Sequence, residues 1–256
     1  MAWAESKKKK PKPIVFFGCV HIGAKTADLE LGKKYVDFVR KHDGYAILLA
    51  DNHECAVPRK AHMMFEQDLT PQEQLDYSVE FFKPIKNNII GAVTGNHAWR
   101  AYHDSGLEMD KEMMARLGKS GRYFRFQGVT EIHYGSQKYR IVFAHGNNIG
   151  RNVFTNCEKL NAQYPTADIY VASHAHILSY FCTQSRDFNS KGNATLRDIH
   201  YISTGSMLNT PLYAEIAMYR PQPKGFAVAW IYPNEYRVDV DTRPNGNNLD
   251  GFCVTR

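Results

Sequence analysis

The sequence predicts an α/β fold of packed layers, and two patterns support this prediction. Short apolar, β-branched runs that end in small or polar clusters recur along the chain, as is typical of buried strands. Helical patterns separate the early runs, whereas the second half consists mostly of strand-like runs. This order favours one layered α/β domain over separate domains. We therefore expect a basic, disordered tail over 1–13 and a single domain over 14–256.

In the first half, strands are predicted at PIVFFGC, YAILLAD and NIIGAVTGN. A helix is predicted over 28–41, where Leu31, Tyr35 and Phe38 lie on one face. A second helix is predicted at TPQEQLDYSVEFFK, because Thr70 and Glu73 form a capping box with a proline in the first turn. Two more helices are expected over 107–117 and 153–163.

In the second half, strands are predicted at YRIVFAHG, ADIYVASH, LSYFCTQSR, LRDIHYIS, GFAVAWIY and EYRVDVD. The segment PNE separates the last two and is expected to be a hairpin turn. The polar stretch FNSKGNAT, over 188–195, is expected to be a loop.

Composition limits the classes of protein. The formal net charge is +6, and five lysines and one glutamate in the first thirteen residues account for +4 of it. The remaining chain is therefore close to neutral, and we interpret the tail as a solvated arm rather than a nucleic-acid site. Five scattered cysteines do not indicate a disulfide framework. Without an apolar stretch of signal-peptide or membrane-span length, we expect a soluble, cytoplasmic protein with no membrane partner.

Polar side chains gather at the ends of five predicted strands, where ligand sites of α/β sheets form. They occur in FFGCVHIG, LLADNHE, VTGNHAW, VFAHGNN and VASHAHI, which supply Cys19, His21, Asp51, Glu54, Asn96, His97, His145, His174 and His176. Carboxylate, amide oxygen and imidazole ligands in this mix suit Zn, Mn, Fe or Ni better than Ca or Mg alone.

Two of these pairs have the same two-residue spacing. On an extended chain, Cys19 and His21 would lie on one face, which leaves open a metal site, a thiol nucleophile or neither. His174 and His176 would likewise point to one side, so that each could serve one of two neighbouring metals.

Five blocks, CVH, ADNHE, GNHA, AHG and SHAH, resemble the calcineurin-like metallophosphoesterase superfamily in order and spacing. The family blocks are D-x-H, G-D-x-x-[DE], G-N-H-[DE], a later H, and G-H-x-H. The resemblance covers about 14–206 and is strongest to compact, stand-alone phage and bacterial members. It implies a four-layer αββα sandwich of two β-sheets packed face to face and flanked by helices.

The resemblance also implies a binuclear phosphoester hydrolase with two divalent ions, which could be Mn, Zn, Fe or Ni. The first implied ion has four ligands: Cys19, His21, Asp51 and His176. The second shares the carboxylate and adds three more ligands: Asn96, His145 and His174. A hydroxide bridging the two ions would attack phosphorus in line.

Two further residues receive catalytic roles from the resemblance. His97 would contact the phosphate and assist the leaving group, and Glu54 would hydrogen-bond His97 and raise its basicity. The expected substrate is a phosphoester, most readily a diester, with nucleic acid or a nucleotide as candidates.

The chain departs from the family pattern at four positions. Cys19 stands at an aspartate position, Ala98 at an acidic position, and Ala50 and Ser173 at glycine positions. Three alternatives therefore remain: a phosphomonoesterase or protein phosphatase of the same fold, a partly degenerate, non-catalytic metal-binding or interaction module, and a cysteine hydrolase using Cys19 with His21.

Other polar residues are expected to lie outside the ligand set. The side chain of His53 is expected to point outward rather than add a ligand. Three basic residues could bind phosphate but are expected to be solvated loop residues: Arg100, His103 and Arg151. The remaining cysteines are expected to be core or surface thiols: Cys55, Cys157, Cys182 and Cys253.

Overall fold

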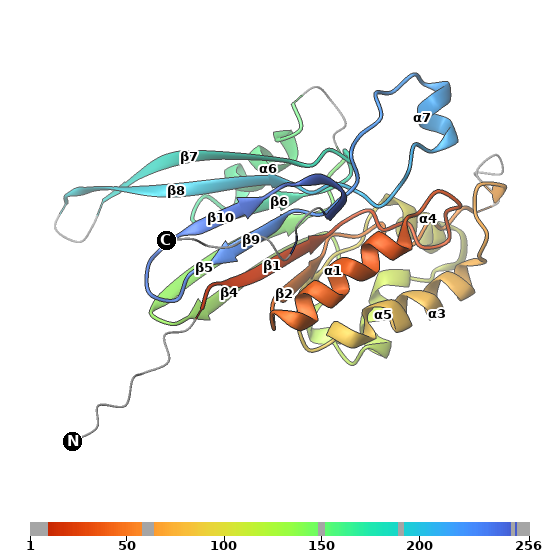
Figure 1. The fold of residues 1–256 in the computed structure, drawn as a ribbon, viewed down its shortest axis with the longest axis horizontal. Coiled ribbons are helices and arrows are strands. Elements are labelled where there is room, and N and C mark those ends of the chain that lie inside the picture. Colours follow the sequence, from red (N-terminus) through yellow and green to blue (C-terminus); the bar gives the residue numbers. More distant parts are fainter. Residues whose placement is uncertain (1–9, 58–63, 148–151, 189–191, 247–248, 250–256) are drawn as a thin grey trace.

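Two five-stranded sheets form the centre of the molecule (Figure 1). The computed structural model describes residues 10–57, 64–147, 152–188, 192–246 and 249. The first sheet has the order β10-β9-β1-β2-β3 and the second β4-β5-β6-β8-β7. The strands are β1 (Lys12–Phe17), β2 (Tyr45–Leu48), β3 (Ile89–Ala92), β4 (Gln127–Tyr134), β5 (Gln137–Ala144), β6 (Ile169–Ala172), β7 (Ser179–Phe188), β8 (Ala194–Ser203), β9 (Val228–Ile231) and β10 (Val238–Asp241).

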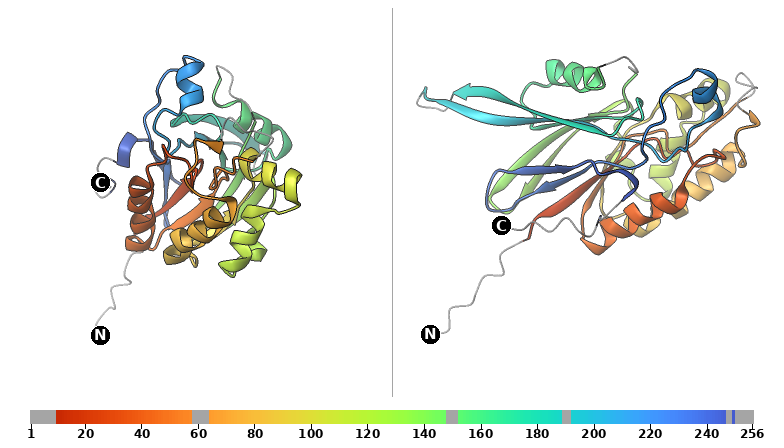
Figure 2. Two further views of the ribbon diagram at one scale, coloured as in Figure 1. Left: turned by 90° about the vertical axis from the view of Figure 1, so that its right-hand side faces the viewer. Right: turned by 45° about the horizontal axis from the view of Figure 1, so that its top comes forward.

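Helices cover the outer faces of both sheets. They are α1 (Leu29–Lys41), α3 (Pro71–Phe82), α4 (Asn96–Ser105), α5 (Met109–Arg116) and α6 (Thr155–Gln163). The short helix α7 (Leu212–Ile216) projects away from both sheets (Figure 1), and 3-10 turns occur at Lys83–Ile85, Ser120–Arg122 and Pro244–Gly246. Figure 2 shows α1 and α3 on the side of the first sheet and α6 on the side of the second. The predicted four-layer αββα sandwich is confirmed.

Side-chain alternation along β1 explains the layers. Ile14 and Phe16 are fully buried in the core between the two sheets, together with Phe143 of β5. Val15 and Phe17 point to the opposite face and pack in the core beneath the helices. Because successive residues of a strand face opposite sides, a strand buried on both faces must be apolar throughout, as PIVFF is.

The predicted helix boundaries are close to the observed ones. Thr70 caps α3 and forms the expected capping box with Glu73, a contact that contributes about 1 kcal/mol in typical helices. The fourth predicted helix begins two residues later than expected, at Thr155. The first strand begins at Lys12, within the expected tail, and residues 1–9 lie outside the described part of the chain. Strands β7 and β8 extend to Phe188 and from Ala194, at the borders of the predicted loop.

Among the strands and α-helices of the described residues, the prediction missed β4, α4 and α7. The alternate buried residues of β4 include Gly128 and Thr130, which make no apolar run. Helix α4 begins at Asn96, in a segment that reads as an ordinary Gly-Asn-His turn.

The parallel strands of both sheets end at the same edge of the sandwich. β1, β2 and β3 run parallel, as do β5, β6 and β8. The backbone carbonyl of Leu49, just after β2, lies 3.0 Å from the ring of His145, just after β5. The polar strand ends of the two sheets therefore meet. Within the described ranges, no helix combines the length and apolar character that a membrane crossing requires.

Candidate metal centre

Backbone hydrogen bonds hold the first two polar loops side by side beyond the strands. The N–H of Cys19 donates to the carbonyl of Ala50 at 2.9 Å, and the N–H of His21 donates to the carbonyl of Asp51 at 2.9 Å. These bonds continue the pairing of β1 with β2. They bring the thiol and the imidazole of the first loop next to the carboxylate of the second.

The extended geometry expected for the two spaced pairs is wrong. Cys19, His21, His174 and His176 have φ values of 56°, 54°, 70° and 56°. Asp51, with φ 46°, also lies in this left-handed region, which residues other than glycine rarely adopt. Such strain persists only where the surrounding structure imposes it, and it concentrates at functional sites. The side chains converge through tight turns rather than through an extended pleat.

The first half of the cluster consists of Cys19, His21 and His176. Their ligand atoms lie within 4.8 Å of one another, and the two histidine Nε2 atoms are 3.4 Å apart. Nδ1 of His21 is 2.8 Å from the Glu54 carboxylate, which accepts its N–H. When the His21 ring is neutral, this contact leaves its Nε2 without a hydrogen, and the lone pair of Nε2 faces the cluster.

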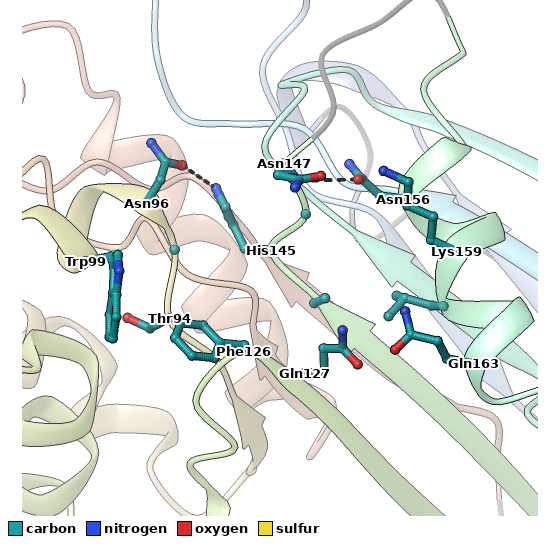
Figure 3. Close-up of a pocket in the computed structure, with 14 residues that line it drawn as sticks. Thr94, Asn96, Trp99, Phe126, Gln127, His145, Asn147, Asn156, Lys159 and Gln163 are labelled. Carbon is teal, nitrogen blue, oxygen red and sulfur yellow. Dashed lines mark hydrogen bonds between the residues drawn. The ribbon is translucent and has the colours of Figure 1, made fainter.

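The second half is centred on Nε2 of His145. This atom lies 3.0 Å from Oδ2 of Asp51 and 3.0 Å from Nδ1 of His174. It also lies 2.9 Å from Oδ1 of Asn96 (Figure 3). Because Nδ1 of His145 donates to the Leu49 carbonyl, its neutral Nε2 has no hydrogen. The oxygens of Asp51 and Asn96 and the ring nitrogens of His145 and His174 thus converge on one point, an arrangement that a hydrogen on one of the nitrogens or a metal ion would satisfy.

The negative charge of Asp51 also favours a metal ion in this half of the cluster. Burial alone would raise the pKa of Asp51, but the surrounding imidazoles, led by His145, hold it well below its usual range. Burial would lower the pKa of His145, but the Asp51 carboxylate outweighs burial and raises it. Burial lowers the pKa of both His174 and His176. The cluster thus offers a buried carboxylate and, in His174 and His176, neutral imidazoles, and such donors fit divalent transition ions.

Cys19 is the unusual donor of this set. It is completely buried, and burial together with the Asp51 charge raises the pKa of its thiol well above the usual value. Its ligand atom lies within 4.8 Å of those of Asp51 and His145 as well as those of the first half. Binding a metal as a thiolate would therefore release a proton.

The roles expected for Glu54 and His97 need correction. The Glu54 carboxylate is 3.5 Å from Nδ1 of His97 but only 2.8 Å from Nδ1 of His21, so its principal partner is His21. Nδ1 of His97 donates instead to the backbone carbonyl of Glu54 at 2.7 Å. Burial lowers the pKa of His97 to about 4 despite the nearby Asp51 and Glu54 charges, so the expected gain in basicity is absent.

Two further expectations about single residues are wrong. His53 points inward: it is completely buried, and Nε2 is 2.8 Å from the Ser78 hydroxyl. Arg100 and His103 lie on α4 rather than on a loop. The Arg100 guanidinium approaches Nε2 of His97 at 3.3 Å, which places a positive charge beside the predicted catalytic ring.

The structure also shows where Ala98 and three of the other cysteines lie. Ala98 is buried in the core beneath the helices. Cys55 and Cys157 are buried thiols, and Cys182 is exposed. Arg151 and Cys253 lie outside the described residues.

A buried network that sequence reasoning missed supports the ligand loops. Asp110 of α5 accepts hydrogen bonds from the Asn52 amide at 3.1 Å and from the Thr94 hydroxyl at 2.7 Å. Asn52 follows Asp51, and Thr94 precedes the Gly-Asn-His turn. The carboxylate therefore links the loops of two predicted ligands, and no local pattern around Asp110 in the sequence indicates this role.

Gly95 offers a direct test of the Asp51 position. A Cβ on Gly95 would lie 2.2 Å from Oδ1 of Asp51, closer than any van der Waals contact allows. That oxygen also accepts the His97 backbone N–H at 3.0 Å, so it cannot move without losing a hydrogen bond. We expect Gly95→Ala to lower metal content after dialysis by at least about tenfold, as for other disturbed ligand shells.

The matched control is Gly121→Ala, because a Cβ at Gly121 has no neighbour within 4 Å. Metal content is measured by elemental analysis and folding by circular dichroism. Full metal retention in a folded Gly95→Ala protein would contradict the position assigned to Asp51.

Comparisons with known proteins establish the fold. No protein-family profile and no curated protein sequence matches the chain. Vps29 from Cryptosporidium parvum has a TM-score of 0.51 at 17% identity, covering 92% of this chain and 100% of that one. A predicted phosphoesterase from Streptococcus pneumoniae has a TM-score of 0.44 at 18% identity, covering 91% of each chain. The chain has the calcineurin-like metallophosphoesterase fold that its motif blocks predicted.

Proposed function

We propose that this protein is a metal-dependent phosphoester hydrolase that uses two divalent ions and prefers diesters. The observation that carries the proposal is the convergence of possible ligand atoms around Nε2 of His145, with Asp51, Asn96 and His174 all within about 3 Å. Cys19 connects the two halves of the cluster. Its ligand atom lies within 4.8 Å of those of His21 and His176 in the first half, and of those of Asp51 and His145 in the second. A cavity beside the second half leaves room for the second ester group of a diester.

The predicted ligands form two sets, one for each ion. Cys19, His21 and His176 would hold one ion, Asn96, His145 and His174 would hold the other, and Asp51 would contact both. When bound, the ion pair would neutralise phosphate charge and make a water molecule acidic enough to attack phosphorus. Glu54 fixes the ring of His21 through Nδ1. The backbone N–H of His97, at the start of α4, holds Asp51 in place.

His97 is the side chain positioned to act on the leaving group. Its Nδ1–H is committed to the Glu54 carbonyl, so proton transfer must use Nε2. With a pKa of about 4, the ring is neutral near pH 7. It can donate only after gaining a second proton, which the negative charge of a bound phosphate favours.

Cys19 should set the metal preference of the first half. A thiolate ligand favours zinc, whereas a carboxylate suits harder ions such as manganese. Aspartate tolerates positive φ better than most residues, so Cys19→Asp fits the backbone at this position. We expect the variant to bind zinc more weakly and manganese more tightly, measured by competition with a chromogenic chelator.

The control is Cys182→Asp, which changes an exposed thiol on β7. If Cys19→Asp leaves both affinities unchanged, Cys19 is not a ligand, and the first half holds its ion through the remaining residues alone.

The proposal is tested with a phosphoester panel. Bis(p-nitrophenyl) phosphate and p-nitrophenyl phosphate are assayed with the purified protein in the presence of Mn²⁺, Zn²⁺ or Ni²⁺ and with a chelator. We expect metal-dependent hydrolysis, faster for the diester. A faster monoester would favour the phosphatase alternative, and activity that persists with chelator would favour the cysteine hydrolase.

A non-catalytic metal-binding or interaction module is the second candidate. Two observations favour it: the thiol at an acidic position, and the similarity to Vps29, a protein named for vacuolar sorting. Against it, six of the seven predicted ligand positions carry the family's residue type, and His97 is present beside them. This candidate predicts bound metal with no turnover of either ester.

A further inference from the structure

A cavity of about 380 Å³ opens beside the second half of the metal cluster. Asn96 and His145, two predicted ligands, lie on its wall together with Trp99, Phe126, Lys159 and Gln163 (Figure 3). The volume is within the usual range for small-molecule pockets, about 300–1,000 Å³. A phosphate held at the cluster would therefore direct its organic group into this cavity.

One wall of the cavity is aromatic. Trp99 of α4 and Phe126 meet edge to face, with ring centroids 4.9 Å apart. Trp99 also stacks on Tyr102, one turn along the helix, with centroids 4.4 Å apart and planes 19° from parallel. The Arg125 guanidinium lies 5.0 Å from the Trp99 ring and 5.2 Å from the Phe126 ring. These contacts hold the wall in one orientation, although Phe126 remains 47% exposed.

The opposite wall is polar and comes largely from α6. Asn156, Lys159 and Gln163 are spaced by three and four residues, so they share one face of that helix. Figure 3 shows them across the cavity from Trp99 and Phe126. Side-chain amides both donate and accept hydrogen bonds, and the lysine ammonium donates. This wall matches the polar edge of a planar heterocycle.

The two walls together select among phosphoesters. An acyl chain would place an apolar surface against the Gln163 amide and the Lys159 ammonium, and dehydrating these groups without a hydrogen bond in return has a cost for each. A small alkyl ester would leave the aromatic wall exposed to water. A nucleobase satisfies both walls, because it has an aromatic face for stacking and a polar edge for hydrogen bonds.

We propose that this cavity is a nucleobase pocket, so that the substrates are phosphodiesters of nucleosides. The proposal rests on the proposed hydrolase function for its catalytic readout but not for its binding readout. Trp99 and Phe126 would contact the base, and Gln163 and Lys159 would contact its edge.

The catalytic test compares two diesters with the same leaving group, thymidine 5′-(p-nitrophenyl) phosphate and methyl p-nitrophenyl phosphate. We expect the manganese-loaded protein to prefer the thymidine ester in kcat/KM. Trp99→Leu should lower this preference by about 5- to 150-fold, the usual loss when one base–aromatic stack is removed. Trp99→Phe, which keeps an aromatic ring, should retain part of it.

The control is Phe188→Leu, an exposed aromatic residue at the end of β7, at the far side of the molecule from α4 (Figure 1). It should leave the preference within about twofold of the unmodified protein. An equal effect of Trp99→Leu on both esters would overturn the pocket assignment.

The binding test separates this proposal from the proposed function. Adenosine 5′-monophosphate, single-stranded oligothymidylate and inorganic phosphate are titrated calorimetrically into the manganese-loaded protein and into Trp99→Leu. We expect tighter binding of the nucleotide or the oligonucleotide than of inorganic phosphate, and the tighter of the two identifies the source of the base. Loss of this difference in Trp99→Leu would support the pocket even if no ester is hydrolysed. Binding of all three with equal affinity would overturn it.

Discussion

Asp51→Asn should remove both metal binding and hydrolysis. Asp51 is the only carboxylate assigned to both ions, and its Oδ2 is 3.0 Å from Nε2 of His145. An amide has no charge to offset two divalent ions and is a weaker ligand. We expect kcat/KM for a diester to fall by at least about a thousandfold, since charge stabilisation and water activation are lost together.

The variant should nevertheless fold. The asparagine oxygen can accept the His97 N–H that Oδ1 of Asp51 now accepts at 3.0 Å. Its amide nitrogen can donate to Nε2 of the neutral His145 ring. The imidazoles around Asp51, led by His145, stabilise its charge, so the metal-free variant should stay folded but melt somewhat lower than the metal-free parent.

A matched control for this substitution is Asp43→Asn. Asp43 has the same φ of 46° as Asp51, but its side chain is 86% exposed. Metal content, melting temperature and diester hydrolysis are measured for both variants. Retention of two ions by a folded Asp51→Asn protein would remove Asp51 from the bridging position.

His97→Asn should impair catalysis while metal content stays the same. Asparagine can preserve the contact with the Glu54 carbonyl, now 2.7 Å from Nδ1, but it cannot transfer a proton. We expect a loss of about 10²–10⁴-fold in kcat for a dialkyl phosphate, the usual contribution of a general acid. The loss should be much smaller for bis(p-nitrophenyl) phosphate, because p-nitrophenolate leaves without protonation.

The same variant gives a pH test with a definite sign. Burial lowers the pKa of His97 to about 4, so the protonated fraction grows as the pH falls toward that value. The ratio of parent to His97→Asn rates for the dialkyl ester should therefore rise on acidification, by up to about tenfold per pH unit. The ratio cancels any pH dependence that the two proteins share.

His133→Asn on β4 is the control, since that imidazole is 72% exposed. Equal losses for both leaving groups would contradict the leaving-group role. A fall in metal content would instead make His97 a ligand, a possibility that its proximity to His21 and Asp51 raises.

The sequence allowed much of the site to be predicted because the chemistry lies in the residues themselves. Carboxylate, amide and imidazole groups follow apolar runs in a fixed order, and parallel strands bring such ends together. The αββα arrangement depended on the family resemblance, because apolar runs such as PIVFF show burial on both faces without showing which sheet lies opposite. Strand β4 was missed because Gly128 and Thr130 occupy alternate buried positions.

Other features depend on contacts between distant residues. The resemblance assigned Glu54 to His97 rather than to His21, because both rings come within 3.5 Å of its carboxylate and only the fold determines which is nearer. The left-handed turns at Cys19 and His176 have no glycine to mark them. The aromatic wall required α4, whose first residues read as a turn. Trp99 was therefore not recognised as part of a pocket.

The most direct test of the binuclear hydrolase is a titration of metal-free protein with Mn²⁺ while hydrolysis of bis(p-nitrophenyl) phosphate and bound metal are followed together. A binuclear hydrolase requires that hydrolysis is absent without metal, rises with occupancy and stops rising when two ions are bound per chain. Two bound ions without hydrolysis of this diester or of p-nitrophenyl phosphate would contradict it, as would hydrolysis by the metal-free protein.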